Sequence, residues 1–252
     1  GLTIILIASA WFTYQAKTAD VQNIKSTLQT KTVIYDRKNE EAGTLYGQKG
    51  TYVTLDKISP QIQNAVLSTE DRTFYSNWGF SIKGILRSFV NLIIHHGQIT
   101  GGGSTITQQL AKNTLLTQQQ SYLRKAQELF LAIQLTKVYS KSDILTMYLN
   151  NAYFGNGVWG VEDASEKYFG KHASELDASE GATIAAMLRS PSYYNPIDNM
   201  QHAVDRRNLI LGLMVDNDKL TQSEAATAKS ETLTLKDNYT DGNANKYPYF
   251  FD

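Results

Sequence analysis

The sequence lacks cysteine altogether and contains only four prolines among its 252 residues. The absence of cysteine excludes disulfide scaffolds, thiolate nucleophiles, and zinc or iron–sulfur sites built on cysteine. Charge of neither sign is in excess, because 24 Lys and Arg balance 24 Asp and Glu. This balance argues against a general nucleic-acid-binding protein. The apolar fraction of 42% suffices for a hydrophobic core and excludes wholesale disorder.

Several catalytic motifs are also missing. The sequence has no HExxH, GxSxG, EF-hand or Walker A pattern, and neither SxxK nor KTG occurs. These absences argue against the enzyme and cofactor classes that such motifs mark. The candidate chemistry has to come from polar clusters of another kind.

Long hydrophobic runs are scarce as well. Residues 1–12 read GLTIILIASAWF, and no charged residue precedes Lys17, but a membrane-spanning helix needs about 20 apolar residues. Two interpretations remain open for this run: a buried core helix, or the outer end of a truncated transmembrane anchor at 1–16. Trp11 and Tyr14 favour the anchor, because amphipathic rings collect at the membrane interface.

The chain after this run divides by its pattern into a β-rich stretch and a long helical one. The runs TVIYD, TLYG and TYVTL predict a small β element within a linker at 17–56. A mostly helical domain is predicted to follow at 57–230. Its first helix is expected to begin at Ser59-Pro60, because Ser suits the N-cap and Pro the first helical position. The Pro- and Asn-rich segment at 190–199 predicts a loop. Capping-box spacing predicts three helix starts, at Ser140 with Asp143, Asp177 with Glu180, and Thr221 with Glu224.

Three polar clusters could carry chemistry, and the first is Glu70-Asp71. It lies between the apolar segment QIQNAVLST and the aromatic segment RTFYSNWGF. Partial desolvation there would raise the pKa of a carboxylate and make it a better base near neutral pH. The alternative is a solvated pair of acids at a helix end.

The second cluster is the glycine-rich stretch GGGST at 101–105, which leads into ITQQLAKN. Glycine lets backbone N–H groups approach an anion, and a helix N-terminus adds a favourable dipole. Hydroxyl, amide and ammonium groups follow within three turns: Ser104, Thr105, Gln108, Gln109, Lys112 and Asn113. The alternative is a flexible loop that precedes an ordinary helix.

The third cluster is Arg124, Lys125 and Glu128, whose spacing puts both cations beside the carboxylate on one helix face. The alternative is a surface trio of charges, which would stabilise little. Taken together, the clusters suit attack on a sugar whose leaving group is a phosphate. A pyrophosphate needs neutralisation of its charge more than a proton, whereas a glycosidase leaving group needs a carboxylic acid to protonate it.

Four motifs resemble those of the family 51 glycosyltransferases, the peptidoglycan glycosyltransferase domain. The chain carries EDxxFxxxxG at 70–79, GGSTITQQLAKN at 102–113, RKxxE at 124–128 and SKxxILxxYLNxxYFGxGxxG at 140–160. The resemblance runs from about residue 55 to 215. It departs from the family at Asn77, where His is common, and at Gln120, where many members carry Arg.

The resemblance implies a mainly α, lysozyme-like fold with the small N-terminal β element, and a glycosyltransferase domain at 57–230. It implies polymerisation of lipid II, with the growing lipid-linked glycan as donor and lipid II as acceptor. The implied catalytic residues are Glu70, which would deprotonate the attacking 4-hydroxyl with inversion at the anomeric carbon, and Glu128, which would order the pyrophosphate site. Lys112, Arg124 and Lys125 would hold the pyrophosphate. The implied substrate-binding residues are Asp71, Phe74, Ser104, Thr105, Gln108, Gln109, Lys112, Asn113, Arg124 and Lys125.

The resemblance assigns no metal ligand and requires no cofactor, although a divalent cation, Mg²⁺ or Mn²⁺, would be compatible with the donor pyrophosphate. It implies a bacterial cell-membrane protein with one N-terminal anchor and an extracytoplasmic catalytic domain. The expected partners are lipid II, the growing glycan, the membrane and cell-wall synthesis proteins, but no nucleic acid. The apolar stretch at 80–100 would lie in the bilayer or, alternatively, form an ordinary core helix.

The β element at 31–56 and the aromatic tail look more like those of class A penicillin-binding proteins, whereas the anchor remnant fits both single-domain and bifunctional members. Residues 231–252, which end in YPYFFD, are interpreted as a linker toward an absent transpeptidase domain. Since SxxK and KTG are missing, we expect this chain neither to bind β-lactams nor to crosslink peptides. Two rival functions remain open. One is a lysozyme-like lytic hydrolase, which leaves the three cations unexplained, and the other is a non-catalytic lipid- or partner-binding module.

Overall fold

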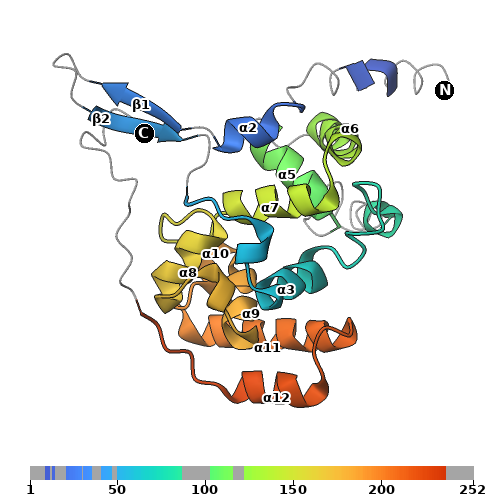
Figure 1. The fold of residues 1–252 in the computed structure, drawn as a ribbon. Helices are drawn as coiled ribbons and strands as arrows, with labels where there is room; N and C mark the ends of the chain where they lie inside the picture. Colours follow the sequence, from blue (N-terminus) through green and yellow to red (C-terminus); the bar gives the residue numbers. More distant parts are fainter. Residues whose placement is uncertain are drawn as a thin grey trace. The chain divides into compact units, whose positions relative to one another are not determined.

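The computed structural model describes residues 9–11, 13–14, 21–29, 31–35, 41–46, 50–86, 103–115 and 122–236. These residues are mainly helical (Figure 1), which confirms the predicted fold class. They belong to two compact units. Unit 1 comprises Gly1–Ile24 and Glu70–Tyr148, and unit 2 comprises Lys25–Thr69 and Leu149–Asp252.

The predicted small β element is present, but the run TYVTL at 51–55 takes no part in it and leads instead into a 3₁₀ turn. Strands β1 (Lys31–Tyr35) and β2 (Glu41–Tyr46) pair antiparallel, with Lys31 opposite Tyr46. A bulge between Ile34 and Tyr35 interrupts the register. Helix α2 (Ile24–Gln29) precedes this pair of strands.

Unit 1 is built on two packed helices, α5 (Ile106–Leu115) and α6 (Tyr122–Val138). It also contains Glu70, the last residue of α3 (Pro60–Glu70), and most of α7 (Lys141–Asn151). Its interior is apolar, and the side chains almost fully removed from solvent include Phe74, Ile106, Leu110, Leu135, Ile144 and Leu145. Burial of each such side chain contributes roughly 1.5–3 kcal/mol, and it makes this interior a firm support for the polar residues at its edge.

Unit 2 is arranged around α9 (Ala178–Met187), which packs against α8 (Val161–Phe169), α10 (Pro191–Tyr194), α11 (Met200–Asp216) and α12 (Gln222–Ser230). Short 3₁₀ turns lie at Leu55–Lys57 (η1) and Ala173–Glu175 (η2). Helix α9 can be surrounded because its sequence, ASEGATIAAM, is rich in small residues. A Cβ added at Gly181 would lie only 2.9 Å from the backbone nitrogen of Ile62.

The helix starts follow the predicted signals. Capping boxes form at Asp177 with Glu180 and at Thr221 with Glu224, and Ser140 Oγ accepts a hydrogen bond from the backbone N–H of Asp143 at 3.1 Å. Helix α3 begins at Pro60 as expected. The loop predicted at 190–199 contains one helical turn, α10, because Pro191 suits the first helical position.

Some expectations fall at the edges of what the structure describes. Residues 9–11 and 13–14 include helical positions, but no helix within the described ranges is long and apolar enough to cross a membrane. Gly101, Gly102, Gln120 and residues 87–100 and 237–252 lie outside the described residues. The predictions for the YPYFFD tail and for most of the 80–100 stretch lie there as well.

Candidate functional site

The carboxylate of Asp71 joins three segments of unit 1. It accepts hydrogen bonds from Asn77 Nδ2 at 3.0 and 3.1 Å and from the backbone N–H of Ile106, the first residue of α5, at 3.2 Å. Burial raises the pKa of Asp71, while these donors oppose the rise. Lys141 Nζ donates to Asn77 Oδ1 at 2.9 Å and lies 4.7 Å from the centre of the Phe74 ring. Asp71 therefore ties the start of α5 to Asn77, and Phe74 packs under Lys141 of α7.

Thr105 and Gln108 form a capping box at the start of α5. Thr105 Oγ1 accepts from the backbone N–H of Gln108 at 3.1 Å, and Gln108 Oε1 accepts from the backbone N–H of Thr105 at 2.9 Å. Thr105 also donates to the carbonyl oxygen of Gly79 at 2.7 Å. Both side chains are buried. Two of the predicted substrate-binding groups thus serve to begin the helix, which is the role that Thr-x-x-Gln spacing indicates.

The general base expected from the sequence, Glu70, is held by α5. Gln109 Nε2 donates to Glu70 Oε2 at 3.1 Å, and Tyr148 on α7 donates its hydroxyl hydrogen to Gln109 Oε1 at 3.0 Å. Burial, reinforced by the negative charge of Glu70, raises the pKa of the Tyr148 phenol well above its usual range. The phenol consequently stays a donor, and it directs the NH₂ end of the Gln109 amide to the carboxylate.

The third cluster is not a surface trio of charges. Glu128 is only 1% exposed, and Lys125 Nζ lies 2.6 Å from its Oε1. The same ammonium donates to Ser104 Oγ, two residues before α5. Within the described residues, Glu128 Oε2 is buried without a hydrogen-bond partner. Lys125 is thereby fixed between Glu128 on its own helix and the segment that leads into α5.

The remaining candidates lie on the same two helices. Lys112 follows Gln108 by four residues and Gln109 by three, so it shares their face of α5. Asn113 is exposed on that helix, and Arg124 lies in the first turn of α6. The structure therefore brings all the predicted site residues into unit 1.

The long motif at 140–160 divides between the two units. In unit 2, Asn150 accepts from the backbone N–H of Val53 at 2.9 Å and donates to its carbonyl oxygen at 2.8 Å. Gly160 has a φ of +83°, and a Cβ there would lie 2.7 Å from the carbonyl oxygen of Asn150. The Asn and the last Gly of the motif therefore have roles in backbone structure: Asn150 binds the backbone of Val53, and Gly160 allows a close approach to Asn150.

Sequence reasoning missed two side chains that contact the candidate site, Tyr148 and Lys141. Both belong to the 140–160 motif, which the resemblance matched without giving its members a role. The signal was present in the long match, but only the fold shows that Tyr148 reaches Gln109 and that Lys141 reaches Asn77.

The sequence is similar to those of known proteins. Residues 37–215 match the family described as Transglycosylase. Penicillin-binding protein 2a of Streptococcus pneumoniae serotype 2 (strain D39 / NCTC 7466) is 49% identical over 256 residues, which cover 100% of this chain and 34% of the relative. Penicillin-binding protein 1F of Bacillus subtilis (strain 168) is 41% identical over 211 residues, 84% of this chain and 29% of that protein.

One solved structure is also similar. It is the crystal structure of penicillin-binding protein 1A from Haemophilus influenzae, with a TM-score of 0.47 and 23% identity over 83% of this chain and 21% of that one. The chain spans about a third of the length of the curated relatives named above. The resemblance inferred from the motifs is confirmed by the family match and by the similarity to these penicillin-binding proteins, and the chain belongs to the Transglycosylase family.

Proposed function

We propose that this chain polymerises lipid II into glycan strands, by inverting transfer from a lipid pyrophosphate-linked donor to the 4-hydroxyl of the acceptor. The observation that carries the proposal is that the base, on α3, and the cation, on α6, are each hydrogen-bonded to the segment at the start of α5. Glu70 is hydrogen-bonded to Gln109 of α5, and Lys125 is hydrogen-bonded to Ser104 just before that helix. A proton acceptor and an anion site are thereby tied to a common support in unit 1.

Glu70 is proposed as the general base. Its side chain is half-buried, and the bond from Gln109 engages Oε2. The other oxygen, Oε1, would take the proton of the 4-hydroxyl as that oxygen attacks the anomeric carbon. Such proton transfer typically contributes about 10²–10⁴-fold to a rate.

Lys112, Arg124 and Lys125 are proposed to bind the departing pyrophosphate. Lys125 is already positioned by Glu128 and Ser104, so little side-chain freedom is lost when the anion binds. Cations that are in place before the reaction stabilise the negative charge that develops on the leaving group. Glu128 would act by ordering Lys125.

A divalent cation, Mg²⁺ or Mn²⁺, fits this arrangement without being required by it. Glu128 Oε2 is a buried carboxylate oxygen that accepts no hydrogen bond from the described residues, and carboxylate oxygen is the ligand that such ions prefer. The ion would supply further neutralisation of the pyrophosphate charge.

We also propose that unit 1 contacts a lipid bilayer, with the catalytic residues on its extracytoplasmic side and an N-terminal anchor upstream. Large apolar side chains between 75 and 86 are exposed, among them Tyr75 at 58%, Trp78 at 76%, Ile82 at 68% and Leu86 at 59%. Exposed apolar groups that gather in one segment mark interaction sites, and amphipathic rings suit the membrane interface. A lipid-linked substrate would be reached from such a surface.

The proposal is tested by incubating the chain with labelled lipid II in detergent or vesicles and measuring the length of the products. Long glycan chains are the expected result. Shortening of preformed glycan would indicate a lytic hydrolase instead, and binding of lipid II without turnover would indicate a non-catalytic module. Either of these two outcomes would overturn the proposal.

A further inference from the structure

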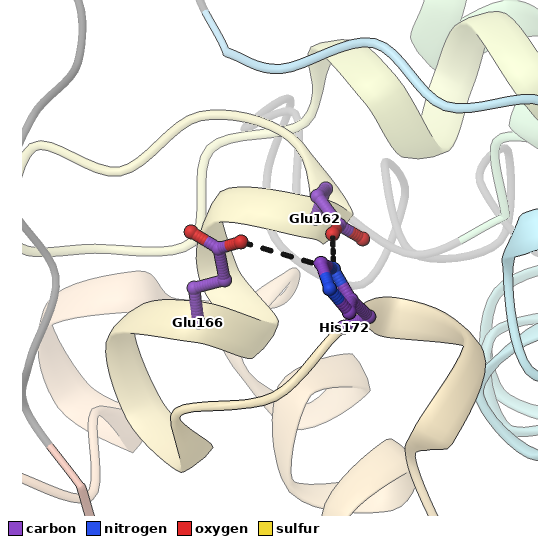
Figure 2. A group of neighbouring side chains, drawn as sticks. All are labelled: Glu162, Glu166 and His172. Atoms are coloured by element: carbon purple, nitrogen blue, oxygen red, sulfur yellow. Dashed lines mark hydrogen bonds and ion pairs between the residues drawn. The ribbon is translucent and has the colours of Figure 1, made fainter.

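A second group of ionisable side chains lies in unit 2, apart from all the residues assigned above. Glu162 and Glu166 are one turn apart on α8, and His172 follows the turn that ends this helix (Figure 2). Gly170 makes that turn possible, because it takes a φ of +64°, a value that side chains other than glycine seldom adopt. The chain then folds back, and the imidazole faces the two carboxylates.

The donor atoms of these three side chains converge. His172 Nδ1 lies 2.6 Å from Glu162 Oε1 and 3.9 Å from Glu166 Oε1, and the three ligand atoms all lie within 4.8 Å of one another. Two ligands at tetrahedral angles around Zn²⁺ are about 3.4 Å apart, given metal–ligand bonds of about 2.1 Å. The two distances to Nδ1 bracket that value.

One of the three ligands is rigid and two can adjust. The Glu162 side chain is 7% exposed, and its Oε2 accepts a hydrogen bond from the backbone N–H of Ala173 at 2.9 Å. This bond orients the carboxylate so that Oε1 faces the imidazole, as an outer-shell partner does in metal sites. The Glu166 and His172 side chains are 44% and 70% exposed, so rotation of their side chains can bring them to bonding distance and leave room for water.

The charge of the surroundings favours a cation. Helix α8 places the carboxylates of Glu162, Asp163 and Glu166 within its first two turns. The carboxylates that face His172 are those of Glu162 and Glu166 on α8 and Glu175 on η2. A divalent ion would neutralise this group more fully than one imidazolium can.

We propose that Glu162, Glu166 and His172 bind one Zn²⁺ ion, through one carboxylate oxygen from each Glu and Nδ1 of the His, with water completing the coordination. A single imidazole with two carboxylates suits zinc better than calcium or magnesium, which prefer oxygen alone. Zinc would replace the hydrogen bond between His172 Nδ1 and Glu162 Oε1. Binding should therefore weaken as the pH falls and the imidazole becomes protonated.

The test is calorimetric titration of the 252-residue chain with ZnCl₂ at pH 7.5, after treatment with a chelator. We expect one equivalent of Zn²⁺ to bind, and we expect His172→Ala and Glu166→Gln each to weaken binding at least ~10-fold. His202→Ala, which removes a His that stacks on Tyr193 in the same unit, is the matched control and should bind as the unmodified chain does. Circular dichroism would verify that each variant is folded.

Failure of the unmodified chain to bind Zn²⁺ at 1:1 stoichiometry would overturn the proposal and leave an ion pair between His172 and Glu162. Binding that survives both substitutions would overturn it too, because the ion would then be held elsewhere. A loss in His202→Ala equal to that in His172→Ala would have the same meaning. None of these results depends on glycosyltransferase activity.

Discussion

The amide of Gln109 lies between two oxygen atoms of opposite character, the carboxylate of Glu70 and the hydroxyl of Tyr148. Its Nε2 is 3.1 Å from Glu70 Oε2, and its Oε1 is 3.0 Å from the Tyr148 hydroxyl. Because a protonated phenol can donate and a carboxylate can only accept, the amide has one orientation that satisfies both. The proposed base is therefore oriented by Gln109, which is itself held by the buried Tyr148.

Replacing Glu70 by Gln should abolish most of the activity. The amide keeps nearly the same shape but cannot accept the proton, so we expect polymerisation to slow by at least ~100-fold, the lower end for a lost general base. The measurement is the initial rate of lipid II consumption. Glu231→Gln, which removes an exposed carboxylate in unit 2, is the control. Near-normal polymerisation by Glu70→Gln would refute the assignment.

Replacing Tyr148 by Phe should lower the turnover number without preventing substrate binding. The substitution leaves the Gln109 amide free to rotate, and the loss of one hydrogen bond of about 1.4 kcal/mol corresponds to about tenfold in rate. Tyr153→Phe is the matched control, since the Tyr153 hydroxyl accepts only a loop N–H, from Gly157 at 3.1 Å, among the bonds described here. A purely structural role for Tyr148 would instead lower the melting temperature and leave kcat of the folded fraction unchanged.

Gly79 and Gly157 offer a comparison of strain with and without a steric clash. Both have positive φ, +88° and +73°. A Cβ at Gly79 would lie 2.6 Å from the carbonyl oxygen of Ala132 and from Thr136 Oγ1, whereas a Cβ at Gly157 meets no atom within 4 Å. We expect Gly157→Ala to cost about 1–2 kcal/mol of unfolding free energy, and Gly79→Ala about 1–3 kcal/mol more. Urea unfolding measures both, and equal costs would contradict the described packing of Gly79 on α6.

The ion pair of His172 should make stability depend on pH. Its hydrogen bond with Glu162 raises the pKa of His172 above the unperturbed 6.5. A raised pKa in a base means that the stabilisation is fully present below pH 6.5 and is lost as the pH rises through the folded-state pKa. In the presence of a chelator, the stability difference between the unmodified chain and His172→Ala should therefore shrink from pH 6 to pH 9. A difference that grows over this range would contradict the assigned pair.

The exposed apolar segment of unit 1 should carry membrane binding. Trp78→Ser combined with Ile82→Ser removes two of its most exposed apolar side chains, and we expect at least a ~10-fold loss of sedimentation with anionic phospholipid vesicles. Leu209→Ser, at a side chain that is 49% exposed in unit 2, should sediment as the unmodified chain does. Unchanged sedimentation of the double variant would place the membrane contact elsewhere.

Local signals in the sequence were sufficient to predict much of this fold. The Ser59-Pro60 start of α3, the boxes at Asp177 and Thr221, and the β-rich runs that became β1 and β2 all depend on interactions between near neighbours. The turn at Pro191 was missed, because a Pro- and Asn-rich segment suits both a loop and one helical turn.

The sequence predicted a set of site residues, and the structure shows which of them contact one another and which begin a helix. From the sequence, Thr105 and Gln108 could equally be substrate ligands or helix caps. Only the geometry shows that they cap α5. The spacing of Lys125 and Glu128 predicted their contact, but not that Glu128 is buried. Burial depends on which helices pack together, and Tyr148 lies 39 residues from Gln109 along the chain, so no local pattern could pair them.

The amide of Gln109 also determines whether Glu70 has to share a proton with a neighbouring group. A glutamate in its place would set a second carboxyl group at hydrogen-bond distance from Glu70, and two such groups cannot both ionise at that separation. The pair would hold one proton in common, as coupled acids do. One of the two carboxylates would then already be protonated before the substrate bound. By being isosteric but uncharged, Gln109 leaves Glu70 as a lone acceptor.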